Sequence, residues 1–567
     1  MHRDWVWNRS NATTVSAHRG VEEDHGTVRP STHPPRDCVK PALTILGPGA
    51  HPRLFARPDV IFRKGRFTLL NDGQSPRDAT IADLVAIHDA LDAAAIEHLL
   101  VRRDDDRPVI AIDWSRIADV EAALARAFAI EPFYSRAGSD AALLVAEGSL
   151  SVTPNPRVLR MYRPRASAKG RLRYGASSGV RVEFWKFDSD TIYAPAENAL
   201  MRRSLPRSEA IDATVELHDR TWSTLGGMFD TLASDVTFDI DMVFSWVDGT
   251  SSEFQRARAR RMASYVVGDG DDSEARYRQI DELKYALRSV YLFAPWVRRI
   301  FIVTDSPRPT WLADHPRVTI VRSEEFFADV SVLPTHNSHA VESQLHHIEG
   351  LSEHFIYSND DMFFGRPVRP EMFFSPGGVT KFIEATTRIG LGDPAVQRSG
   401  FENGARVNRA LLRQRFGRTT TRHLEHAATP LRRSVMAELE AEFAEDFART
   451  AASAFRSSTD ISVTNSLYHY YALMTGRAVV QTGARVRYVE TTLKNAAGEM
   501  SRLLKRRDYD FFCLNDGSRP EISVERRTKS VHAFLERYYS VPAVWEVGVR
   551  PEDESASSSA AQGQPAG

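Results

Sequence analysis

Four short apolar runs in the second half of the chain each stop on acidic side chains. The clearest is Phe355-Ile356-Tyr357, which leads through Ser358 into Asn359-Asp360-Asp361. Continuous apolar runs of this length are typical of strands that are covered on both faces, as in a mostly parallel sheet. Ligands of such sheets bind beyond the carboxyl ends of the strands. The runs and the acids that follow them are 240–247 with Asp248, 300–303 with Asp305, 355–357 with Asp360 and Asp361, and 511–514 with Asp516.

Acids delivered to one edge of a sheet concentrate negative charge, which is costly unless a cation lies there. A divalent metal that carries a phosphate is the expected partner, and oxygen ligands favour Mg²⁺ or Mn²⁺. The adjacent pair Asp360-Asp361 is the strongest local signal. An isolated Asn-Asp-Asp is more often a turn, and only its repetition at four strand ends favours a metal site. Asp248 precedes a glycine, a pair common in turns, so by itself it is a weak signal.

Between these runs the apolar positions change to a helical spacing. Leu283, Ala286, Leu287 and Val290 form a one-sided stripe, and Pro295 ends that helix. The order of strands and helices predicts an α/β fold whose catalytic core is a Rossmann-like, mostly parallel sheet with helical insertions. Further helices are expected at 338–349, 436–447 and 463–474, and a further strand at 318–321.

The chain before this core predicts a small α/β region without a catalytic constellation. Helical periodicity spans 81–101 and 117–129, and Asp113 or Ser115 can cap the second helix. Strands are expected at 108–112, 158–162 and 180–187.

These patterns divide the chain into four parts. We expect a disordered N-terminus (1–45), an N-terminal α/β extension (46–235), a catalytic domain (236–545) and a disordered tail (546–567). The loops of the extension are basic, and a solvated charged surface is favoured over a patch that faces an acceptor or a membrane. The basic residues are Arg157, Arg160, Arg163, Arg165, Lys169, Arg171 and Arg173.

Composition excludes several classes of protein. A chain of 567 residues is too long for one hydrophobic core. A formal net charge of −1 gives no global basic field, so nucleic acid is not an expected partner. The two cysteines, Cys38 and Cys513, cannot form a disulfide framework. No apolar run approaches the roughly 20 residues of a membrane span. We expect a cytoplasmic protein, with peripheral association at the inner face of the membrane left open.

Two further segments carry candidate chemistry. The loop that ends in Asn337-Ser338-His339 leads into a predicted helix, whose start favours a phosphate. An N-cap role for Asn337 or Ser338 is a competing account that can hold at the same time. His339 could donate to a phosphoryl oxygen.

His423 and His426 form a His-x-x-His pair, but no third zinc ligand is apparent. A general base or a histidine that contacts phosphate is therefore preferred. Arg456 could clamp a diphosphate with its planar guanidinium, whereas its local sequence alone favours a surface ion pair.

Taken together, four blocks of this sequence resemble, in order, the Stealth family of sugar-phosphate transferases. That family includes bacterial capsule and exopolysaccharide phosphotransferases and the animal N-acetylglucosamine-1-phosphotransferase. The region before residue 238 is similar, more loosely, to the extension of actinobacterial members. The blocks are 239–249 with Trp246-Val247-Asp248-Gly249, 276–305 with Asp281-Glu282-Leu283-Lys284, 333–361 with Asn337-Ser338-His339 and Asn359-Asp360-Asp361, and 512–516 with Asn515-Asp516.

The resemblance implies a reaction in which a sugar hydroxyl attacks the sugar-side phosphorus of a nucleotide sugar. Hexose-1-phosphate is transferred and a nucleoside monophosphate leaves. The resemblance assigns the metal, Mg²⁺ or Mn²⁺, to Asp360, Asp361 and Asp516. It assigns catalysis to Asp361, His426 as general base, Arg456 as diphosphate clamp, and Asp248, which also helps to hold the donor. The implied substrate-binding residues are Asn337, His339, Glu342, Asp281, Arg288 and Asp305.

Two other functions compete with this one. A metal-dependent glycosyltransferase would also use acids at a strand end, but it would cleave at the sugar carbon and release a nucleoside diphosphate. A carbohydrate-binding protein without catalysis would not need so many converging acids. The expected partners are a nucleotide-sugar donor and an oligosaccharide or polysaccharide acceptor, whose identities the sequence leaves open.

Overall fold

A computed structural model of the chain describes residues 48–71, 73–103, 107–167, 172–249, 280–517 and 520–548. The expected disordered N-terminus, the basic residues Lys169 and Arg171, and residues 276–278 of the second block lie outside the described residues. The expected tail begins too early at residue 546, because Glu546 is buried and pairs with Arg288.

A parallel sheet forms the centre of the C-terminal region, residues 236–548. Its strands are β15 (Ile240–Ser245), β16 (Ile300–Val303), β17 (Val318–Val321) and β18 (His354–Asn359), in the order β17-β16-β15-β18. A last strand, β23 (Thr429–Arg432), pairs antiparallel with β18. The predicted Rossmann-like, mostly parallel core is thus confirmed. Ser245 lies opposite both Val303 and Asn359, so β15, β16 and β18 end at the same edge.

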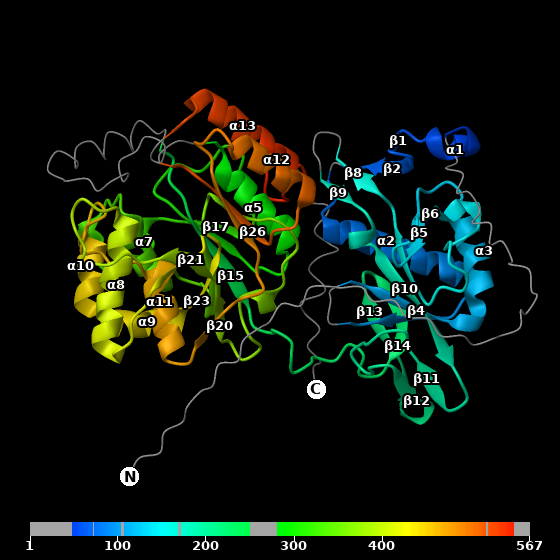
Figure 1. The fold of residues 1–567 in the computed structure, drawn as a ribbon. Coiled ribbons are helices and arrows are strands. Elements are labelled where there is room, and N and C mark those ends of the chain that lie inside the picture. The colour runs from blue at the N-terminus through cyan, green and yellow to red at the C-terminus, as the bar shows by residue number, and fades with distance from the viewer. Residues whose placement is uncertain are drawn as a thin grey trace, which may run out of the picture. The chain divides into compact units, whose positions relative to one another are not determined.

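Each face of this sheet is covered by its own hydrophobic core, because neighbouring side chains of a strand point to opposite faces. Met242 and Phe244 pack with α5 (Glu282–Phe293), α12 (Ala496–Arg506) and α13 (Val524–Tyr538). Val243 and Phe301 pack with α7 (Ser338–Gln344), α9 (Arg433–Glu442) and α11 (Tyr468–Met474) on the other face. Figure 1 shows these two groups of helices on either side of the sheet, with α8 (Gly400–Phe416) and α10 (Ala444–Ala452) beside the second group.

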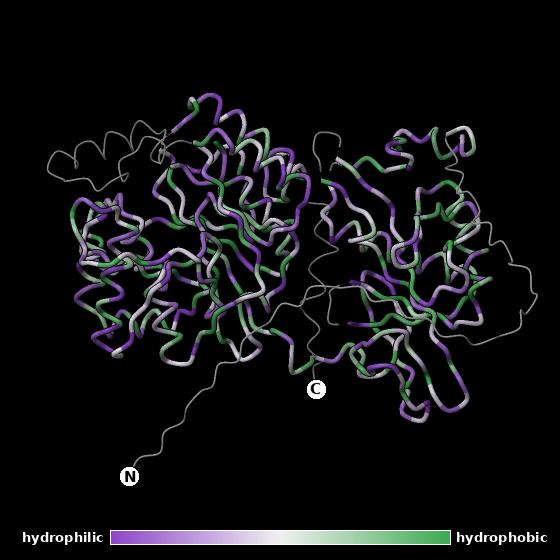
Figure 2. Tube along the Cα trace, viewed as in Figure 1, coloured by the Kyte–Doolittle hydropathy of each residue, from purple (hydrophilic) through white to green (hydrophobic). Residues whose placement is uncertain are grey.

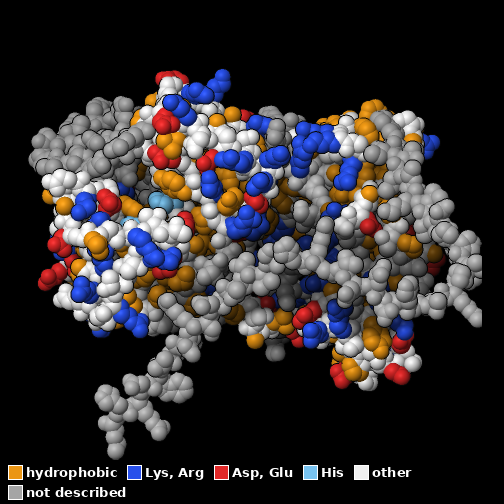
Figure 3. Space-filling view, in the orientation of Figure 1, with side chains coloured by type: hydrophobic (Ala, Val, Ile, Leu, Met, Phe, Trp, Pro, Cys, Tyr) orange, Lys and Arg blue, Asp and Glu red, His pale blue; other side chains and the backbone are white. Residues whose placement is uncertain are grey.

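The outward turns of α12 and α13 are largely hydrophilic (Figure 2), as the amphipathic spacing of their residues requires. Lys and Arg side chains gather over these two helices (Figure 3). Three of them, Lys505, Arg506 and Arg537, belong to the last turns, where positive charge stabilises the carboxyl end of a helix.

The strand that carries Asp516 belongs to a second, smaller sheet, which the sequence did not predict. Here β26 (Phe511–Asn515) pairs with β19 (Met362–Phe364) and β25 (Val486–Glu490). The chain turns at Asp360-Asp361 and runs back along β26, so that the Leu514 N–H donates to the Asp361 carbonyl at 3.0 Å. Asp516 follows a strand of the smaller sheet, whereas Asp360 and Asp361 follow a strand of the main sheet, so these acids approach one edge from two different sheets.

Helix boundaries differ from the predictions in three places. The helix predicted at 436–447 is two helices, α9 and α10, which separate at Phe443. The helix predicted at 338–349 is shorter, since α7 ends at Gln344 and a 3₁₀ turn (Leu345–His347) follows. The helix predicted at 463–474 begins with a π-helical turn (Val463–Leu467) before α11.

The N-terminal region, residues 48–235, contains an eight-stranded sheet within its described residues. The early strand β4 (Val109–Asp113) pairs with the late strand β10 (Val180–Phe187), so one sheet joins both halves of the region. The periodicity at 81–101 was wrong at its end: α2 (Pro76–Ala93) stops at the left-handed Ala95, and β3 (His98–Val101) follows. Asp113 caps the turn before α3 (Ile117–Ala127) by accepting from the Ser115 N–H.

Two of the basic residues assigned to a solvated surface point inward instead. Asp83 Oδ1 on α2 accepts hydrogen bonds from Arg163 Nε at 2.7 Å and from Arg165 Nη2 at 2.9 Å. Asp83 and Arg165 are both buried, so these arginines neutralise a buried acid and are not a binding patch.

The remaining elements complete the chain. They are α1 (Pro52–Phe55), β1 (Val60–Arg63), β2 (Arg66–Leu70), β5 (Tyr134–Ala137), β6 (Leu143–Leu144), β7 (Val158–Tyr162), β8 (Arg165–Ala166), β9 (Arg173–Tyr174), β11 (Thr191–Tyr193), β12 (Ser204–Pro206), β13 (Asp212–Leu217), β14 (Arg220–Leu225), α6 (Ser323–Phe326), β20 (Thr380–Phe382), β21 (Glu384–Arg388), β22 (Arg422–Leu424) and β24 (Ala478–Val480). Among the described helices none has the length and apolarity needed to cross a bilayer.

Candidate active site

Three acids meet where β18 ends, and we call them the acid edge: Glu282, Asp360 and Asp361. Burial raises the pKa of Asp360 well above its usual value, and the negative charges of Asp361 and Glu282 raise it further. Glu282 opens α5, is buried, and accepts a hydrogen bond from the Ile280 N–H at 2.7 Å. The sequence placed Glu282 in a helix beside Asp281 and gave no sign that it faces the acids.

His426 lies next to the acid edge. Burial lowers the pKa of His426, and the negative charge of Asp361 acts in the opposite direction. The imidazole packs against the ring of Tyr488, with 5.1 Å between centroids, and against Phe401 at 5.8 Å. Asp361 and His426, which are 65 positions apart in sequence, are therefore within electrostatic range of each other in the structure.

Asp516 is not a free acid at this edge. Its side chain is 8% exposed and forms an ion pair with Arg527 of α13, and its Oδ1 also accepts from Thr491 Oγ1 at 2.8 Å. Arg527 Nε donates to the same threonine hydroxyl at 2.6 Å. Sequence reasoning missed Arg527 and Thr491, because Arg527 lies on a helix and Thr491 follows β25, a strand that the sequence did not predict.

The acid edge fits Mg²⁺ or Mn²⁺ with a small number of protein ligands. Carboxylate oxygens are the donors that these ions prefer. Burial, and then the charges of Asp361 and Glu282, raise the pKa of Asp360, and a cation would offset both effects. Among the described residues, no three acidic ligand atoms at this edge lie within 4.8 Å of one another. Mg²⁺ commonly uses one or two carboxylates and takes its other ligands from water and substrate phosphates.

The start of α7 is held by the protein itself. Asn337 caps the helix by accepting from the His339 N–H at 3.1 Å, and its Nδ2 donates to Asp460 Oδ2 at 2.8 Å. His339 Nδ1 lies 3.9 Å from the same carboxylate oxygen. Both side chains are buried, so the N-cap account of Asn337 is confirmed and neither residue presents its side chain to solvent.

A network of polar side chains connects this helix to the acid edge, and we call it the α7 network: Ser338, Glu342, Tyr357, Arg456 and Thr464. Arg456 Nη2 donates to Ser338 Oγ at 2.7 Å. Glu342 accepts from Thr464 Oγ1 at 2.6 Å, and the Tyr357 hydroxyl lies 3.3 Å from its other oxygen. The same hydroxyl is 2.9 Å from Asn359 Oδ1, the residue before Asp360.

Burial raises the pKa of Glu342, whereas the hydrogen bond from Thr464 and the charge of Arg456 lower it. Arg456 also packs closely on Gly400 at the start of α8, where an added Cβ would lie 2.6 Å from Arg456 Cδ. Ser338 and Gly400 therefore both constrain the side chain of Arg456.

The structure places four other predicted residues as follows. Arg288 makes a two-pronged ion pair with Glu546, with both N–O distances 2.6 Å. Asp305 accepts from the backbone and hydroxyl of Ser323 and so caps α6. Asp281 is exposed, with a left-handed φ of 58°. The Asp248 N–H donates to Ser306 Oγ at 2.8 Å, and its side chain is half-buried after β15.

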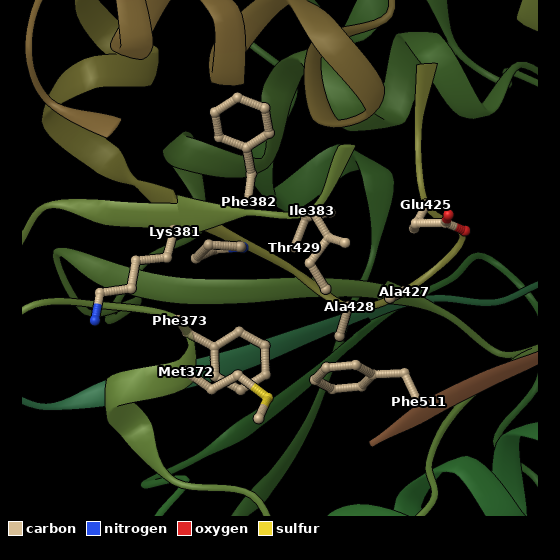
Figure 4. A pocket seen from close by; sticks show the side chains of 11 residues that line it. Met372, Phe373, Lys381, Phe382, Ile383, Glu425, Ala427, Ala428, Thr429 and Phe511 are labelled. Carbon is tan, nitrogen blue, oxygen red and sulfur yellow. The ribbon is translucent and has the colours of Figure 1, made fainter. Parts of the chain in front are cut away.

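A pocket of about 270 Å³, including the solvent at its mouth, opens beside Glu425 and Ala427, the two neighbours of His426. Figure 4 shows Phe373, Phe382 and Phe511 lining it from three different strands or turns. Its apolar walls hold the backbone on both sides of His426 in place.

Asp460 supplies a test of how the loop that contains Arg456 is held. Burial raises its pKa from 3.8 to about 6, although hydrogen bonds from the Ser457 N–H and Asn337 lower it. Because the folded-state pKa is raised, the stability linked to this group is present below about pH 4 and is lost as the pH rises through about 6.

We expect Asp460→Asn to remove that loss. Between pH 4.5 and 7 the wild type should lose on the order of 2 kcal/mol of unfolding free energy relative to the variant. Urea unfolding at four pH values across this range measures the difference. Parallel pH curves for the two proteins would contradict the assignment.

Comparison with known proteins identifies relatives of this chain. Models of Stealth protein conserved regions 1, 2, 3 and 4 match residues 238–266, 276–382, 425–473 and 501–555. Exopolysaccharide phosphotransferase CpsY of Mycobacterium tuberculosis is 57% identical over 509 residues, which cover 89% of this chain and 96% of the relative. An exopolysaccharide phosphotransferase of Nocardia farcinica is 55% identical over 469 residues, covering 83% and 88%. One from Streptomyces coelicolor is 38% identical over 499 residues, covering 85% of both chains.

Solved structures overlap with the chain only partly. The galactosyltransferase LgtC, in complex with donor and acceptor sugar analogues, has a TM-score of 0.28 and 11% identity, over 55% of this chain and 98% of that one. The bifunctional glycosyltransferase WbbM has a TM-score of 0.29 and 10% identity, over 57% and 54%. Overlaps this low carry no argument. The sequence relatives do, since they match across most of both chains: the chain belongs to the Stealth family of exopolysaccharide phosphotransferases.

Proposed function

We propose that this protein transfers a hexose-1-phosphate, such as N-acetylglucosamine-1-phosphate, from a nucleotide sugar to a sugar hydroxyl in exopolysaccharide synthesis. The observation that supports the proposal is that a buried histidine, His426, lies within electrostatic range of Asp361, just beyond the end of β18. A proton acceptor and an acidic, metal-suited edge are the two parts that attack of a hydroxyl on a phosphodiester requires.

In this mechanism His426 takes the proton from the acceptor hydroxyl. The acceptor oxygen then forms a bond to the sugar-side phosphorus, and the bond from that phosphorus to the bridging oxygen breaks. The leaving group is a nucleoside monophosphate. Burial lowers the pKa of His426, so its imidazole is neutral at pH 7 and able to accept the proton.

Asp360 and Asp361 would hold the divalent cation, with Asp516 behind them and partly neutralised by Arg527. A bound Mg²⁺ or Mn²⁺ would neutralise charge on the diphosphate oxygens. Arg456 would bind the diphosphate from the other side, and Ser338 and Glu342 would keep its guanidinium in place. Asp248, at the end of β15, would contact the donor.

Product analysis tests the proposal directly. The protein is incubated with UDP-N-acetylglucosamine, Mg²⁺ and a panel of oligosaccharide acceptors, and the nucleotide product is identified. Release of UMP that depends on an acceptor is the expected result. Release of UDP would instead make the protein a glycosyltransferase, because the bond broken would be that of the sugar carbon. Sugar binding with neither product, across several donors, would favour a non-catalytic carbohydrate-binding protein.

The place of action follows from the substrates. Nucleotide sugars are the donors in this proposal, so we propose that the protein works in the cytoplasm, where it could contact growing polysaccharide at the inner face of the membrane.

A further inference from the structure

A second cluster of metal-ligating side chains lies at the far end of α7, and we call it the His–His–Glu cluster: His346, His347 and Glu440. The two histidines end the 3₁₀ turn after α7, and Glu440 lies on α9. His346 Nε2 and His347 Nε2 lie 2.8 and 2.9 Å from the same oxygen, Glu440 Oε2. One ligand atom from each residue falls within 4.8 Å of the others.

The hydrogen bonding of His347 shows why its close contact with Glu440 needs a positive charge. His347 Nδ1 lies 3.2 Å from the Phe326 carbonyl, which only accepts, so Nδ1 carries a proton. In the neutral ring, Nε2 then directs a lone pair at the carboxylate. Two acceptors 2.9 Å apart repel each other unless the ring takes up a second proton or a metal ion lies between them.

The ring of His346 packs against that of His347, with 4.1 Å between centroids, and its hydrogen bonding among the described residues is at Nε2. Its side chain is 3% exposed, and among the described residues no group hydrogen-bonds to its Nδ1. The contact with Glu440 therefore sets the orientation of this ring. His347 and Glu440 are both 28% exposed, which leaves an ion a route to the cluster from solvent.

We propose that His346, His347 and Glu440 bind a divalent transition-metal ion of the zinc class, separately from the ion of the acid edge. Two imidazoles and a carboxylate are a ligand set that suits Zn²⁺, with a fourth position left for water. Mg²⁺ prefers oxygen ligands only. The bond from His347 Nδ1 to the Phe326 carbonyl is the support that a metal-binding histidine usually has.

The geometry requires only a small adjustment. Ligands that all lie 2.0–2.1 Å from a tetrahedral ion are about 3.3 Å apart. The observed 2.8 and 2.9 Å are shorter, and a small rotation of the partly exposed Glu440 opens them. Arg433 is the nearby positive charge, and its guanidinium is engaged with the carbonyls of His346 and Leu351 at 3.1 and 2.9 Å.

Such an ion would tie the end of α7 to α9. The start of α7 carries Ser338, which binds Arg456, and the helix also carries Glu342. The ion would therefore stabilise the helix that positions Arg456, without touching substrate.

Metal titration of the full chain tests this site. Chelator-treated protein is titrated with Zn²⁺ against a chromophoric competitor, and with Co²⁺ while visible absorption is recorded, both in excess Mg²⁺ to saturate the acid edge. We expect one tight equivalent in the wild type, d–d bands typical of nitrogen and oxygen ligands, and an affinity at least about 100-fold lower in Glu440→Gln. His347→Gln should behave in the same way.

Two matched variants separate this site from others. Glu442→Gln changes an acid on the same helix that pairs with Arg415, and it should keep the ion. Asp92→Asn changes the exposed member of the other described histidine–acid group, His88, Asp92 and His98, and should also keep it. Equal metal affinity in wild type, Glu440→Gln and His347→Gln, or no tight equivalent in the wild type, would overturn the proposal. Circular dichroism and metal-free thermal unfolding establish that each variant is folded.

Discussion

Replacement of Asp361 by asparagine should slow release of the nucleoside monophosphate by about a thousandfold or more, while the protein stays folded. Asp361 is the acid whose charge reaches both Asp360 and His426. The substitution removes a candidate metal ligand and the negative charge that supports His426 once it has taken a proton. Losses of this size are typical when a charge that stabilises phosphoryl transfer is removed.

The thermal stability of Asp361→Asn, unlike its activity, should not fall. The charge of Asp361 raises the pKa of Asp360, so the two carboxylates repel each other in the absence of a cation. Asparagine relieves that repulsion, and metal-free thermal unfolding of Asp361→Asn should therefore occur at the same temperature as wild type or higher. A protein that loses both activity and stability would indicate a structural role for Asp361.

Asp239→Asn is the matched control for this experiment. Asp239 precedes β15 at the opposite edge of the same sheet and pairs on the surface with Arg298. Its loss should leave UMP release within about twofold of wild type, because a surface ion pair contributes little to stability and nothing to the acid edge. Equal activity of wild type and Asp361→Asn would show that the chemistry takes place elsewhere.

The strands of this fold were readable from short stretches rich in apolar residues, which are continuous at 300–303 and interrupted by single polar residues at 318–321, 158–162 and 180–187. The runs at 300–303, 318–321, 158–162 and 180–187 are strands at those same residues. Helical ends were harder, since periodicity does not show where a chain turns. In the N-terminal region Leu99 and Leu100 continue the helical spacing of α2, but the left-handed Ala95 stops the helix and they form β3. The pairing of β3 with β4, a tertiary interaction, decides that these residues form a strand.

The site was predicted less completely, for a physical reason. Acids that end strands can be found by pattern, and Asp360 and Asp361 were. Whether a charged residue serves a ligand or the fold depends on partners far away in sequence. Arg288 is engaged by Glu546, 258 positions away, and no local pattern announces that pair. The burial of Glu282 beside Asp360 is hidden in the same way.

Arg527 is the clearest case of such a hidden partner, and Arg527→Met should cost about 3–5 kcal/mol of unfolding free energy. Arg527 is buried, the side chain of Asp516 is 8% exposed, and the two form an ion pair; Arg527 Nε also donates to Thr491 Oγ1. Methionine fills a similar volume but leaves the Asp516 carboxylate buried without its cation. Breaking one side of a buried pair is far more damaging than replacing both.

Urea unfolding of three variants measures this effect. Arg526→Met, at the neighbouring exposed position of α13, should change stability by less than about 0.5 kcal/mol. The double variant Asp516→Asn/Arg527→Met should recover much of the loss, since no buried charge remains. Equal stability of Arg527→Met and Arg526→Met would contradict the buried pair. If the double variant regains stability but releases less UMP than Arg527→Met does, Asp516 acts at the acid edge as well as in the fold, because the two variants differ only in the Asp516 carboxylate.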